Sequence, residues 1–545
     1  MTLWSEIIVI VLCLLLATNS NGAISTNNDV RQKFPYDFEF GVTTAAYQIE
    51  GAWNIDGKGW SMWDHFVHTK ADKIVDGSNG DDATKSYYLY KRDVEMLKEL
   101  GVDSYRMSIS WSRILPYGHA DYINTPGVAY YNNLINELLA NGITPYVTIY
   151  HWDLPQNLNE QGGWLNEKVI EWFGEYARVA YKLFGDRVKN WMTINEPFIH
   201  CSFAFEVATH PPAIPTPGEG YYECGRNILL AHARAYHIYK DEFKESQKGQ
   251  VGFVGNLEWG IPATNSSDDI QAAFDYKIFH IDHFVHPIYA KEGNYPLRLI
   301  EIIAENSAKE GRNSSRLRPF TKKEVEYIKG TGDFIGLNHY AAVYVSRNSS
   351  LQGRFPVPSL KNDMYFVTSA NPSWPSHGWG HDYAPGLYHV LMYLKDKYDD
   401  PLIYVTENGI SSDDGLVDDM RADYIRNYLG AVLDALRDGV NVRGYFPWSL
   451  MDNFEWIVGY QLKFGLYHVD LVDKNRTRTP KKSALVYKEI IRSRIIDYDY
   501  NPDPYKYTFG AKKDDKVRSA SNAVSYSCEI VVVLLTTLLN LSTLI

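Results

Sequence analysis

Ser104-Tyr-Arg-Met-Ser-Ile109 and Pro145-Tyr-Val-Thr-Ile-Tyr150 are two short segments rich in β-branched and aromatic residues. A longer amphipathic segment lies between them, from Tyr130 to Asn141, and Gly142 follows it. Gly is the residue expected just past the end of a helix. The stretch from 104 to 150 therefore predicts a strand, a helix and a second strand, which is the repeating unit of a parallel α/β fold.

The same alternation continues on both sides of this unit. Further helices are predicted from Ala83 to Leu100, which Gly101 follows, from Glu167 to Phe184 and from Met420 to Asp438. The other predicted strands are Phe40 to Tyr47, Asn190 to Ile194, Val251 to Asn256, Phe334 to Leu337, Leu402 to Thr406 and Arg443 to Trp448. About eight such alternations predict an α/β fold, a single (β/α)8 TIM barrel with long βα loops, rather than a doubly wound sheet.

Two local features bear on the fold. No Gly-rich phosphate-binding fingerprint follows the first predicted strand, which disfavours a dinucleotide-binding fold. The stretch from Asn348 to Pro375 is rich in Ser, Pro and Asn and has no clear periodicity. In a barrel we expect it to form a long βα loop over the face where the strands end.

The composition excludes several classes of protein. Hydrophobic residues make up 45% and charged residues 22% of the 545 residues, so a large core is available and disorder is not expected. The formal net charge is −12 and no long basic run occurs, which argues against nucleic acid as a partner. Neither CxxC nor HExxH occurs, so we expect no metal and no cofactor.

Both ends of the chain resemble processing signals. Residues 1–23 hold an apolar run followed by small polar residues, which predicts a secretory signal peptide; a buried first helix is the alternative. Residues 24–500 form the predicted domain and 501–521 a tail. Residues 522–545 end in an uncharged apolar run, as in a signal for a glycosylphosphatidylinositol (GPI) anchor. A transmembrane anchor or a clipped tail are the rival interpretations. We expect an extracellular protein with possible membrane attachment through lipid.

The cysteines and glycosylation sequons fit secretion. Cys13 and Cys528 lie in the two predicted signals, so Cys201 and Cys224 remain and are expected to form a disulfide. Two separate buried thiols are the alternative. Asn-x-Ser/Thr sequons outside the signals predict glycosylation in surface loops at Asn265, Asn313, Asn348 and Asn475.

Polar residues gather at the carboxyl ends of the predicted strands, which open on one face of a barrel. They are Gln48, Arg106, His151, Asn195, Glu196, Asn338, Tyr340, Glu407, Asn408 and Trp448. Two are carboxylates, Glu196 and Glu407, and glycoside hydrolysis needs two: one protonates the leaving oxygen and the other attacks or activates water. A single Glu beside a loop is usually a solvated surface residue, but two that end apolar strands favour catalysis.

The segments around these residues resemble the motifs of glycoside hydrolase family 1. Thr193-Ile-Asn-Glu-Pro197 and Val405-Thr-Glu-Asn-Gly409 are similar to its two catalytic signatures. The other matching segments are Thr44 to Gly51, Tyr105 to Arg113, His151 to Pro155 and Trp448 to Trp456. The resemblance covers roughly Phe34 to Ile495, and the sequons and predicted secretion make animal, especially insect, members the most similar.

The resemblance implies a (β/α)8 barrel and a small β-glucoside as substrate, hydrolysed with retention of configuration. Glu196 matches the general acid/base and Glu407 the nucleophile, with Arg106 and Tyr340 in contact with Glu407. Residues matching those that bind the sugar are Gln48, His151, Asn195, Asn338, Trp448, Glu455 and Trp456. In this match Glu455 accepts hydrogen bonds from the sugar hydroxyls O4 and O6, and Trp456 donates to O3. Trp448 lies under the apolar face of the sugar ring.

Some residues depart from the family pattern. Phe198 stands where Trp is common, Trp60 where Pro is common, and the segments from Cys201 to Cys224 and at Ile457-Val458 are unusual. Because of these departures, the resemblance does not indicate which aglycone the site prefers. A thioglucosidase acting on glucosinolates, as in insect members that also keep the acid/base Glu, is one alternative function. A catalytically silent sugar receptor is the other, although both glutamates are present.

Overall fold

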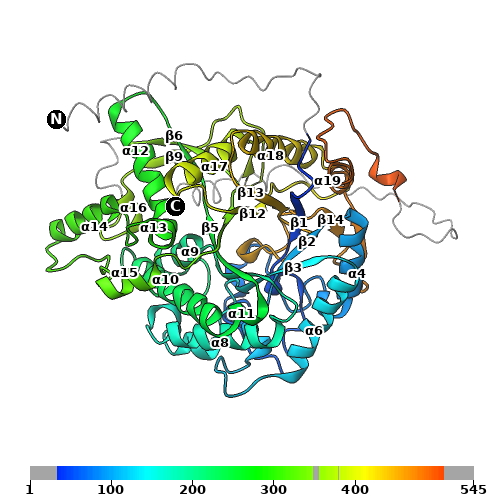
Figure 1. Ribbon diagram of the computed structural model, residues 1–545, viewed down its shortest axis with the longest axis horizontal. Helices are drawn as coiled ribbons and strands as arrows, with labels where there is room; N and C mark the ends of the chain where they lie inside the picture. Colours follow the sequence, from blue (N-terminus) through cyan, green and yellow to red (C-terminus); the bar gives the residue numbers. More distant parts are fainter. Residues whose placement is uncertain (1–32, 348–354, 379, 508–545) are drawn as a thin grey trace.

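The computed structural model describes residues 33–347, 355–378 and 380–507. The predicted signal peptide, the predicted GPI signal and Asn348 lie outside the described residues. Within them, the chain forms a closed barrel of eight parallel strands with helices around it (Figure 1). The predicted (β/α)8 barrel is confirmed.

The barrel strands run parallel in the closed order β1-β13-β12-β7-β5-β4-β3-β2. Their bounds are β1 Glu39–Thr43, β2 Ser104–Ser108, β3 Thr144–Tyr150, β4 Asn190–Asn195, β5 Gln250–Asn256, β7 Phe334–Asn338, β12 Ile403–Asn408 and β13 Val442–Pro447. Each of the eight predicted strands overlaps one of these. Their apolar, β-branched sequences fit strands that are buried on both faces of the sheet.

The helices that alternate with the barrel strands form an outer ring (Figure 1). They are α4 Ser86–Leu100, α6 Thr125–Ala140, α8 Val169–Phe184, α10 Gly220–Ile238, α13 His283–Tyr289, α17 Pro385–Lys397, α18 Asp419–Arg437 and α19 Lys482–Ser493. The predicted helix stop at Gly101 is confirmed, because this residue caps α4 with a φ of 80°. Such left-handed backbone is accessible to Gly without a steric penalty.

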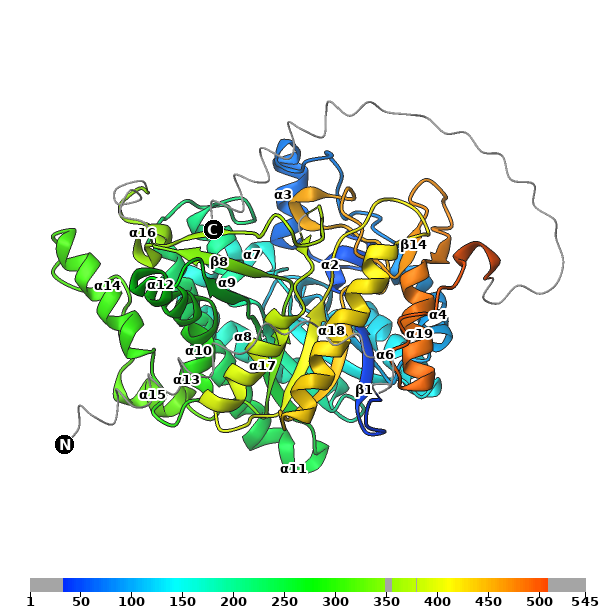
Figure 2. The ribbon, with the colours of Figure 1, turned by 90° about the horizontal axis from the view of Figure 1, so that it is seen from above.

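The remaining elements lie mainly in the loops. The helices are α2 Ala46–Ile49, α3 Met62–Thr69, α5 Trp111–Ile114, α7 Gln156–Glu160, α9 Pro197–Cys201, α11 Lys244–Gln247, α12 Ser267–Lys277, α14 Leu297–Lys309, α15 Lys322–Ile328 and α16 Leu360–Met364, with a π-helical segment at Ile278–Asp282. Short strands are β6 Trp259–Pro262, β8 Ala342–Ser346, β9 Val367–Ser369, β14 Tyr467–Val469 and β15 Arg478–Pro480. Figure 2 shows α2, α3 and α7 toward one end of the barrel and α11 at the other.

The interior of the barrel is filled rather than hollow. Six strands each contribute one large side chain to a compact cluster: Tyr146, Met192, Val254, Phe334, Tyr404 and Phe446. These side chains exclude water from the barrel axis, as the packed interior of this fold requires. Reacting groups can therefore meet a ligand at the carboxyl ends of the strands, above this layer.

Two predicted segments differ from the structure. The strand predicted to reach Tyr47 ends at Thr43, and the chain turns into α2, where the hydroxyl of Ser108 accepts the backbone N–H of Ala46 at 2.7 Å. Gln48 therefore lies on a short helix. The stretch predicted as an irregular loop from Asn348 contains α16 and β9, and β9 pairs with β8 in a three-stranded sheet. Its hydrogen bonds come from a partner distant in sequence, which local periodicity does not reveal.

The last residues of the predicted domain, which ends at residue 500, are held against the barrel. The carbonyl of Asp497 accepts a hydrogen bond from Arg426 of α18 at 3.1 Å. Arg426 also donates to the carbonyl of Tyr500. No helix among the described residues is both long and apolar enough to cross a membrane.

Candidate active site

Glu407 is held at the end of β12 by two donors. Arg106 of β2 donates from Nη1 to Oε1 of Glu407 at 2.5 Å, and the hydroxyl of Tyr340 donates to Oε2 at 2.7 Å. Both glutamate oxygens are therefore engaged, and the carboxylate is buried. Hydrogen bonds to a guanidinium are among the stronger ones in proteins. The carboxyl of Glu407 is thus held in place at the end of β12.

Glu196 follows the last residue of β4 and precedes α9. Its φ is 46°, in the left-handed region that a non-Gly residue rarely adopts. The backbone N–H of Glu196 donates to the carbonyl of Val254 at 3.0 Å, and the amide of Asn338 donates to Oε1 at 2.8 Å. These contacts hold the unusual conformation, and such strain is concentrated at functional sites.

The two carboxyls differ in electrostatic environment. Burial, and then the negative charge of Glu407, raise the pKa of Glu196 well above its ordinary value. The hydrogen bond from Asn338 and the charge of Arg106 lower it by less. Arg106 donates directly to Glu407, whereas the side-chain donor to Glu196 is the neutral Asn338 amide. Two carboxyls in such different environments are typical of acid and base roles.

Asn195 connects the two sides of the site. Its Oδ1 accepts from Arg106 Nη2 at 2.7 Å and from Asn338 Nδ2 at 3.2 Å. The amide nitrogen of Asn195 then faces Nε2 of His151 at 3.2 Å, which makes Nε2 the acceptor and leaves the proton on Nδ1. Burial, and then the charge of Arg106, lower the pKa of His151, so the ring stays neutral.

A second set of polar groups lies on the loop after β13. Gln48 donates from Nε2 to Asn453 Oδ1 at 3.0 Å and to the Phe454 carbonyl at 2.9 Å. The same Nε2 lies 3.5 Å from Oε2 of Glu455. The indole N–H of Trp448 donates to the same oxygen of Glu455 at 3.4 Å. Burial, and then the charge of Glu407, raise the pKa of Glu455 to about 8.

Aromatic rings line this region. Trp456 stacks on His151 with 6.0 Å between ring centroids and lies 4.9 Å from Trp152, while Trp448 stacks on His151 at 6.2 Å. Such surfaces suit the apolar faces of a sugar ring. Two buried polar atoms, Gln48 Oε1 and His151 Nδ1, have no partner among the described residues. Because buried polar groups are normally hydrogen-bonded, these atoms are available to a polar ligand.

The structure brings together all the predicted site residues at the barrel mouth: Glu196, Glu407, Arg106, Tyr340, Gln48, His151, Asn195, Asn338, Trp448, Glu455 and Trp456. Cys201 of α9 is joined to Cys224 of α10 by a disulfide, with 5.8 Å between their Cα atoms. This bond anchors the short helix that begins just after Glu196.

Sequence reasoning missed four contributors. The indole of Trp152 donates to the carbonyl of Asn195 at 2.9 Å, and Thr406 donates to Asn338 Oδ1 at 2.7 Å, which orients the amide toward Glu196. Asn453 positions Gln48, and Glu258 acts electrostatically on Glu196. The first three lie inside or beside the quoted motifs, which was a usable signal. Glu258 lies outside every motif.

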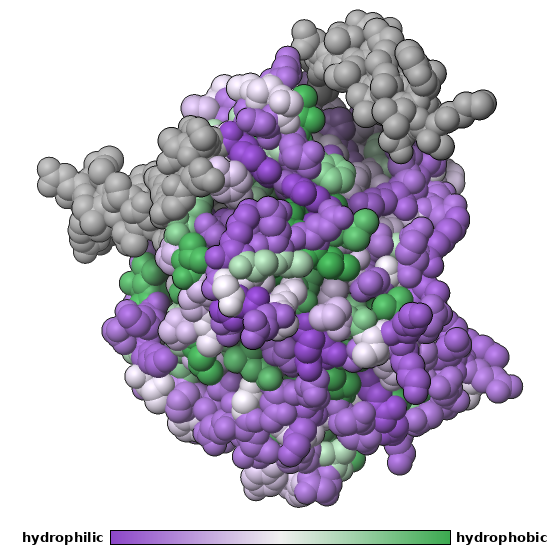
Figure 3. Space-filling model, turned by 90° about the vertical axis from the view of Figure 1, so that its left-hand side faces the viewer, coloured by the Kyte–Doolittle hydropathy of each residue, from purple (hydrophilic) through white to green (hydrophobic). Residues whose placement is uncertain are grey.

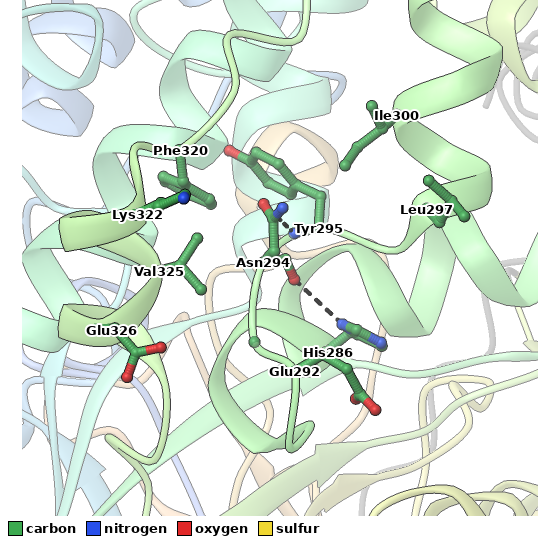
Figure 4. Close-up of a pocket in the computed structure, with 11 residues that line it drawn as sticks. His286, Glu292, Asn294, Tyr295, Leu297, Ile300, Phe320, Lys322, Val325 and Glu326 are labelled. Carbon is green, nitrogen blue, oxygen red and sulfur yellow. Dashed lines mark hydrogen bonds between the residues drawn. The ribbon is translucent and has the colours of Figure 1, made fainter.

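A separate pocket lies at the outer edge of the molecule. It has a volume of about 640 Å³, between α13, α14 and α15. Figure 4 shows Leu297 and Ile300 on one side and Lys322 and Glu326 on the other, with His286 bonded to Asn294. Figure 3 shows the side of the molecule that carries α14, which is largely hydrophilic with scattered apolar residues. This pocket shares no residue with the carboxylate site.

In the part of the chain that the structure describes, no group of three or more His, Cys, Asp or Glu side chains could hold a metal ion. The two catalytic candidates are instead surrounded by hydrogen-bond donors from Arg106, Tyr340 and Asn338.

Comparison with known proteins identifies relatives along nearly the whole described chain. The family model described as glycosyl hydrolase family 1 matches residues 30–495. The chain is 43% identical to Myrosinase 1 of Brevicoryne brassicae over 465 residues, covering 84% of this chain and 98% of the relative. It is 42% identical to the cytosolic beta-glucosidase of Homo sapiens over 468 residues, covering 85% and 99%.

Solved structures give the same picture. An aphid myrosinase matches with a TM-score of 0.81 at 42% identity, covering 85% of this chain and 99% of the other. The rice Os3BGlu6 beta-glucosidase matches with a TM-score of 0.78 at 36% identity, covering 84% and 98%.

Proposed function

The chain belongs to glycosyl hydrolase family 1, and we propose that it hydrolyses terminal β-D-glucosides with retention of configuration, releasing β-D-glucose and an aglycone. The observation that carries this proposal is the pair of buried carboxyls at the barrel mouth. Glu407 is bonded to Arg106 and Tyr340, whereas Glu196 has a raised pKa and accepts only the Asn338 amide as a side-chain donor among the described residues.

In the first step, Glu407 attacks the anomeric carbon while Glu196 gives its proton to the glycosidic oxygen. The bond between that carbon and that oxygen breaks, and the aglycone leaves carrying the proton. The sugar remains as an ester of Glu407. The raised pKa of Glu196 favours the protonated form that this step requires.

In the second step, Glu196 takes a proton from water, and the water oxygen attacks the anomeric carbon. Glu407 leaves as a carboxylate and Glu196 is again protonated. Esterification removes the charge of Glu407, which is one cause of the raised pKa of Glu196, so this pKa falls and Glu196 can act as a base. We predict a separation of about 5 to 5.5 Å between the two carboxyls, as retention requires.

The sugar is proposed to lie between the aromatic rings and the polar groups of the second loop. Glu455 would accept from O4 and O6, Gln48 and His151 would use their unpartnered atoms, and Asn195 would bind a hydroxyl near Glu407. Trp448 would lie under the ring and Trp456 would donate to O3. Most of these groups are neutral at neutral pH, so each hydrogen bond to the sugar contributes roughly 0.5 to 1.5 kcal/mol.

A hydrolysis panel tests the proposal. Purified protein is given aryl β-glucosides, cellobiose and a glucosinolate, and the first-formed anomer of glucose is followed by NMR. We expect hydrolysis of the aryl β-glucosides with β-glucose formed first. Hydrolysis of the glucosinolate alone would support a thioglucosidase instead. No hydrolysis, with tight binding of glucose, would support a sugar receptor.

We also propose that the protein passes through the secretory pathway. The disulfide supports this, and three of the four sequon asparagines, Asn265, Asn313 and Asn475, are exposed as glycan attachment requires. Digestion with an N-glycosidase should lower the apparent mass of protein expressed in animal cells. An unchanged mass would contradict glycosylation at these sites.

A GPI anchor is the proposed fate of the C-terminal signal, with Ser519 or Ser521 as the attachment residue, because small residues there precede a polar spacer and an apolar run. Phosphatidylinositol-specific phospholipase C should release β-glucosidase activity from intact cells that express the full chain. Activity that stays on the cells, or that appears in the medium untreated, would contradict the anchor.

A further inference from the structure

A third carboxyl, Glu258, acts electrostatically on the proposed acid/base and lies on the chain that continues from β5. Val254 belongs to the cluster inside the barrel, and Asn256 of the same strand pairs in register with Asn338. The backbone N–H of Leu257 then donates to the carbonyl of Asn338 at 2.9 Å, so the extended chain runs on for at least one more residue. Side chains of an extended chain alternate between its two faces, so Glu258 lies on the same face as Val254 and Asn256.

Glu258 is fixed by one side-chain contact. The hydroxyl of Tyr276 donates to its Oε2 at 2.9 Å, and within the described residues its Oε1 receives no hydrogen bond. The side chain is partly exposed, whereas Tyr276 is buried. Glu258 can therefore meet a ligand with one oxygen while the other stays bonded to the protein.

A line of stacked rings connects this carboxyl to the acid/base. Tyr276 stacks on His280 with 3.9 Å between ring centroids, and His280 lies 4.2 Å from Phe198. Phe198 is two residues past Glu196, in α9. Because Glu196 protonates the leaving oxygen in the proposed mechanism, the aglycone must leave on this side. The three rings are buried and support Glu258 from behind, and Glu258 with these rings is called the Glu258 wall below.

The charges around this wall are unfavourable for an anion. The charged side chains that act on Glu196 are Glu407, Arg106 and Glu258. Arg106 is committed to protein acceptors, which include Glu407, Asn195 and the Thr406 carbonyl. It cannot also bind an anionic aglycone without losing these contacts.

The histidines nearby do not supply positive charge. Burial lowers the pKa values of His200, His210 and His280 to about 3, so each ring is neutral at working pH. Two basic groups lie near the Glu258 wall. Lys361 of α16 acts on His280, and its ammonium lies 5.5 Å from the centroid of the Phe355 ring. Lys277 of α12 lies 4.7 Å from the ring centroid of Trp259, the residue after Glu258.

We propose that Glu258 determines the charge class of the aglycone, so that the site accepts neutral aglycones and discriminates against anionic ones. This inference rests on the proposed function and deepens it. The glucosinolates carry a permanently charged sulfate on the aglycone, so the same carboxyl would disfavour a thioglucosidase activity toward them. Like-charge repulsion in a partly buried site is large enough to change a specificity ratio about tenfold.

The discrimination should depend on pH. Burial raises the pKa of Glu258 to about 7, and the hydrogen bond from Tyr276 opposes this. The ionisable groups that interact with it are Tyr276, Glu196 and Tyr428, and Tyr276 packs on the neutral His280. Below about pH 6 Glu258 is mostly neutral and repulsion is weak; above about pH 8 it is ionised and repulsion is full.

The test compares two aryl β-glucosides whose ring carries a carboxamide or a carboxylate at the same position. The ratio of kcat/KM for the neutral over the anionic substrate is measured from about pH 5.5 to about pH 8.5, where the carboxylate is always ionised. In the wild type we expect this ratio to rise about tenfold across the range. Glu258→Gln should make it independent of pH. Glu245→Gln, which removes an exposed acid of α11, is the matched control and should leave the rise unchanged.

Tyr276→Phe provides an independent variant. It keeps the carboxyl but removes the donor that favours its charged form, so the rise in the ratio should move to higher pH. A ratio that is flat in the wild type, or that still rises in a folded Glu258→Gln protein, would overturn the inference. Failure to hydrolyse the neutral glucoside at all would instead contradict the proposed function, so the two failures are distinguishable.

Discussion

Two buried Arg–Glu pairs in this protein have nearly the same local structure. In one, Arg106 contacts Glu407 at 2.5 Å and Tyr340 donates to the other glutamate oxygen at 2.7 Å. In the second, Arg113 contacts Glu50 at 2.8 Å and Tyr131 donates to the other oxygen at 2.6 Å. The arginine side chains are 1% exposed and the glutamate side chains 5% exposed in both pairs.

An acid with a raised pKa lies near each pair. Burial and Glu50 raise the pKa of Asp153 to about 7, as burial and Glu407 raise that of Glu196. The pairs differ in what they connect. Arg106 of β2 reaches Glu407 of β12 across the barrel mouth, whereas Glu50 and Arg113 tie together the loops after the neighbouring strands β1 and β2.

The space beside each pair also differs. The cavity beside Glu50 and Arg113 measures about 10 Å³, which is room for about one water molecule. Beside Glu407 lie the aromatic rings and the unpartnered atoms of Gln48 and His151. An Arg–Glu–Tyr arrangement with a nearby raised pKa is therefore not sufficient to identify a nucleophile. Position across the barrel and access for a ligand make the difference.

The largest expected effect is the loss of turnover on replacement of Glu407. Glu407→Ala should lower kcat by at least about 10⁴-fold, because no glycosyl ester can form. Azide or formate should partly restore activity and give a product of α configuration. Rates are measured with an aryl β-glucoside and the product is identified by NMR. Activity near the wild-type level would show that this pair is structural, like its counterpart.

A second prediction separates the roles of the two catalytic carboxyls. Glu196→Gln should lower kcat by roughly 10²- to 10⁴-fold on poor leaving groups, which need the proton. With an activated leaving group the first step should survive, so rapid mixing should show a burst of aglycone followed by slow turnover. An equal loss on both kinds of substrate, with no burst, would contradict the acid/base role.

Replacement of Glu50, in the pair that ties the two loops together, should lower stability and leave activity nearly unchanged. Glu50→Gln leaves Arg113 buried without its counter-charge, so we expect a loss of about 3 kcal/mol in the free energy of unfolding. The kcat/KM of the folded protein should stay within about threefold of the wild type. Denaturant titration and kinetics at low temperature measure the two quantities. A loss of activity without a loss of stability would place Glu50 in the catalytic machinery.

The smallest expected effect is on stability as a function of pH. Because the folded-state pKa of Glu196 is raised, its contribution to stability is present below its unfolded-state pKa of about 4.3 and is lost as pH rises through the folded-state pKa. Glu196→Gln removes this loss. The melting temperature of Glu196→Gln minus that of the wild type should therefore increase between about pH 5 and pH 9, by a few degrees at most. Glu245→Gln serves as the control, and parallel curves for Glu196→Gln and wild type would contradict the raised pKa.

The sequence predicted most of the local structure. All eight barrel strands were recognisable, because a strand buried on both faces reads as a short apolar run wherever it lies in the barrel. The end of α4 at Gly101 was also predictable from local sequence, since it depends on the freedom of one residue to adopt a positive φ. The motifs containing Glu196 and Glu407 also marked which residues would meet, although they lie far apart in the chain.

Closure of the barrel decided the rest. The family resemblance paired Arg106 with Glu407 in advance, but no sequence pattern paired Arg113 with Glu50. The order of the strands shows that the first pair spans the mouth and the second joins neighbouring loops. The turn that puts Gln48 on a helix and the ring contacts that connect Glu258 to Phe198 likewise depend on partners distant in sequence. Periodicity reports which face of a segment is buried, but a hydrogen bond or a charge interaction depends on the distance between two atoms, and only the folded chain determines that distance.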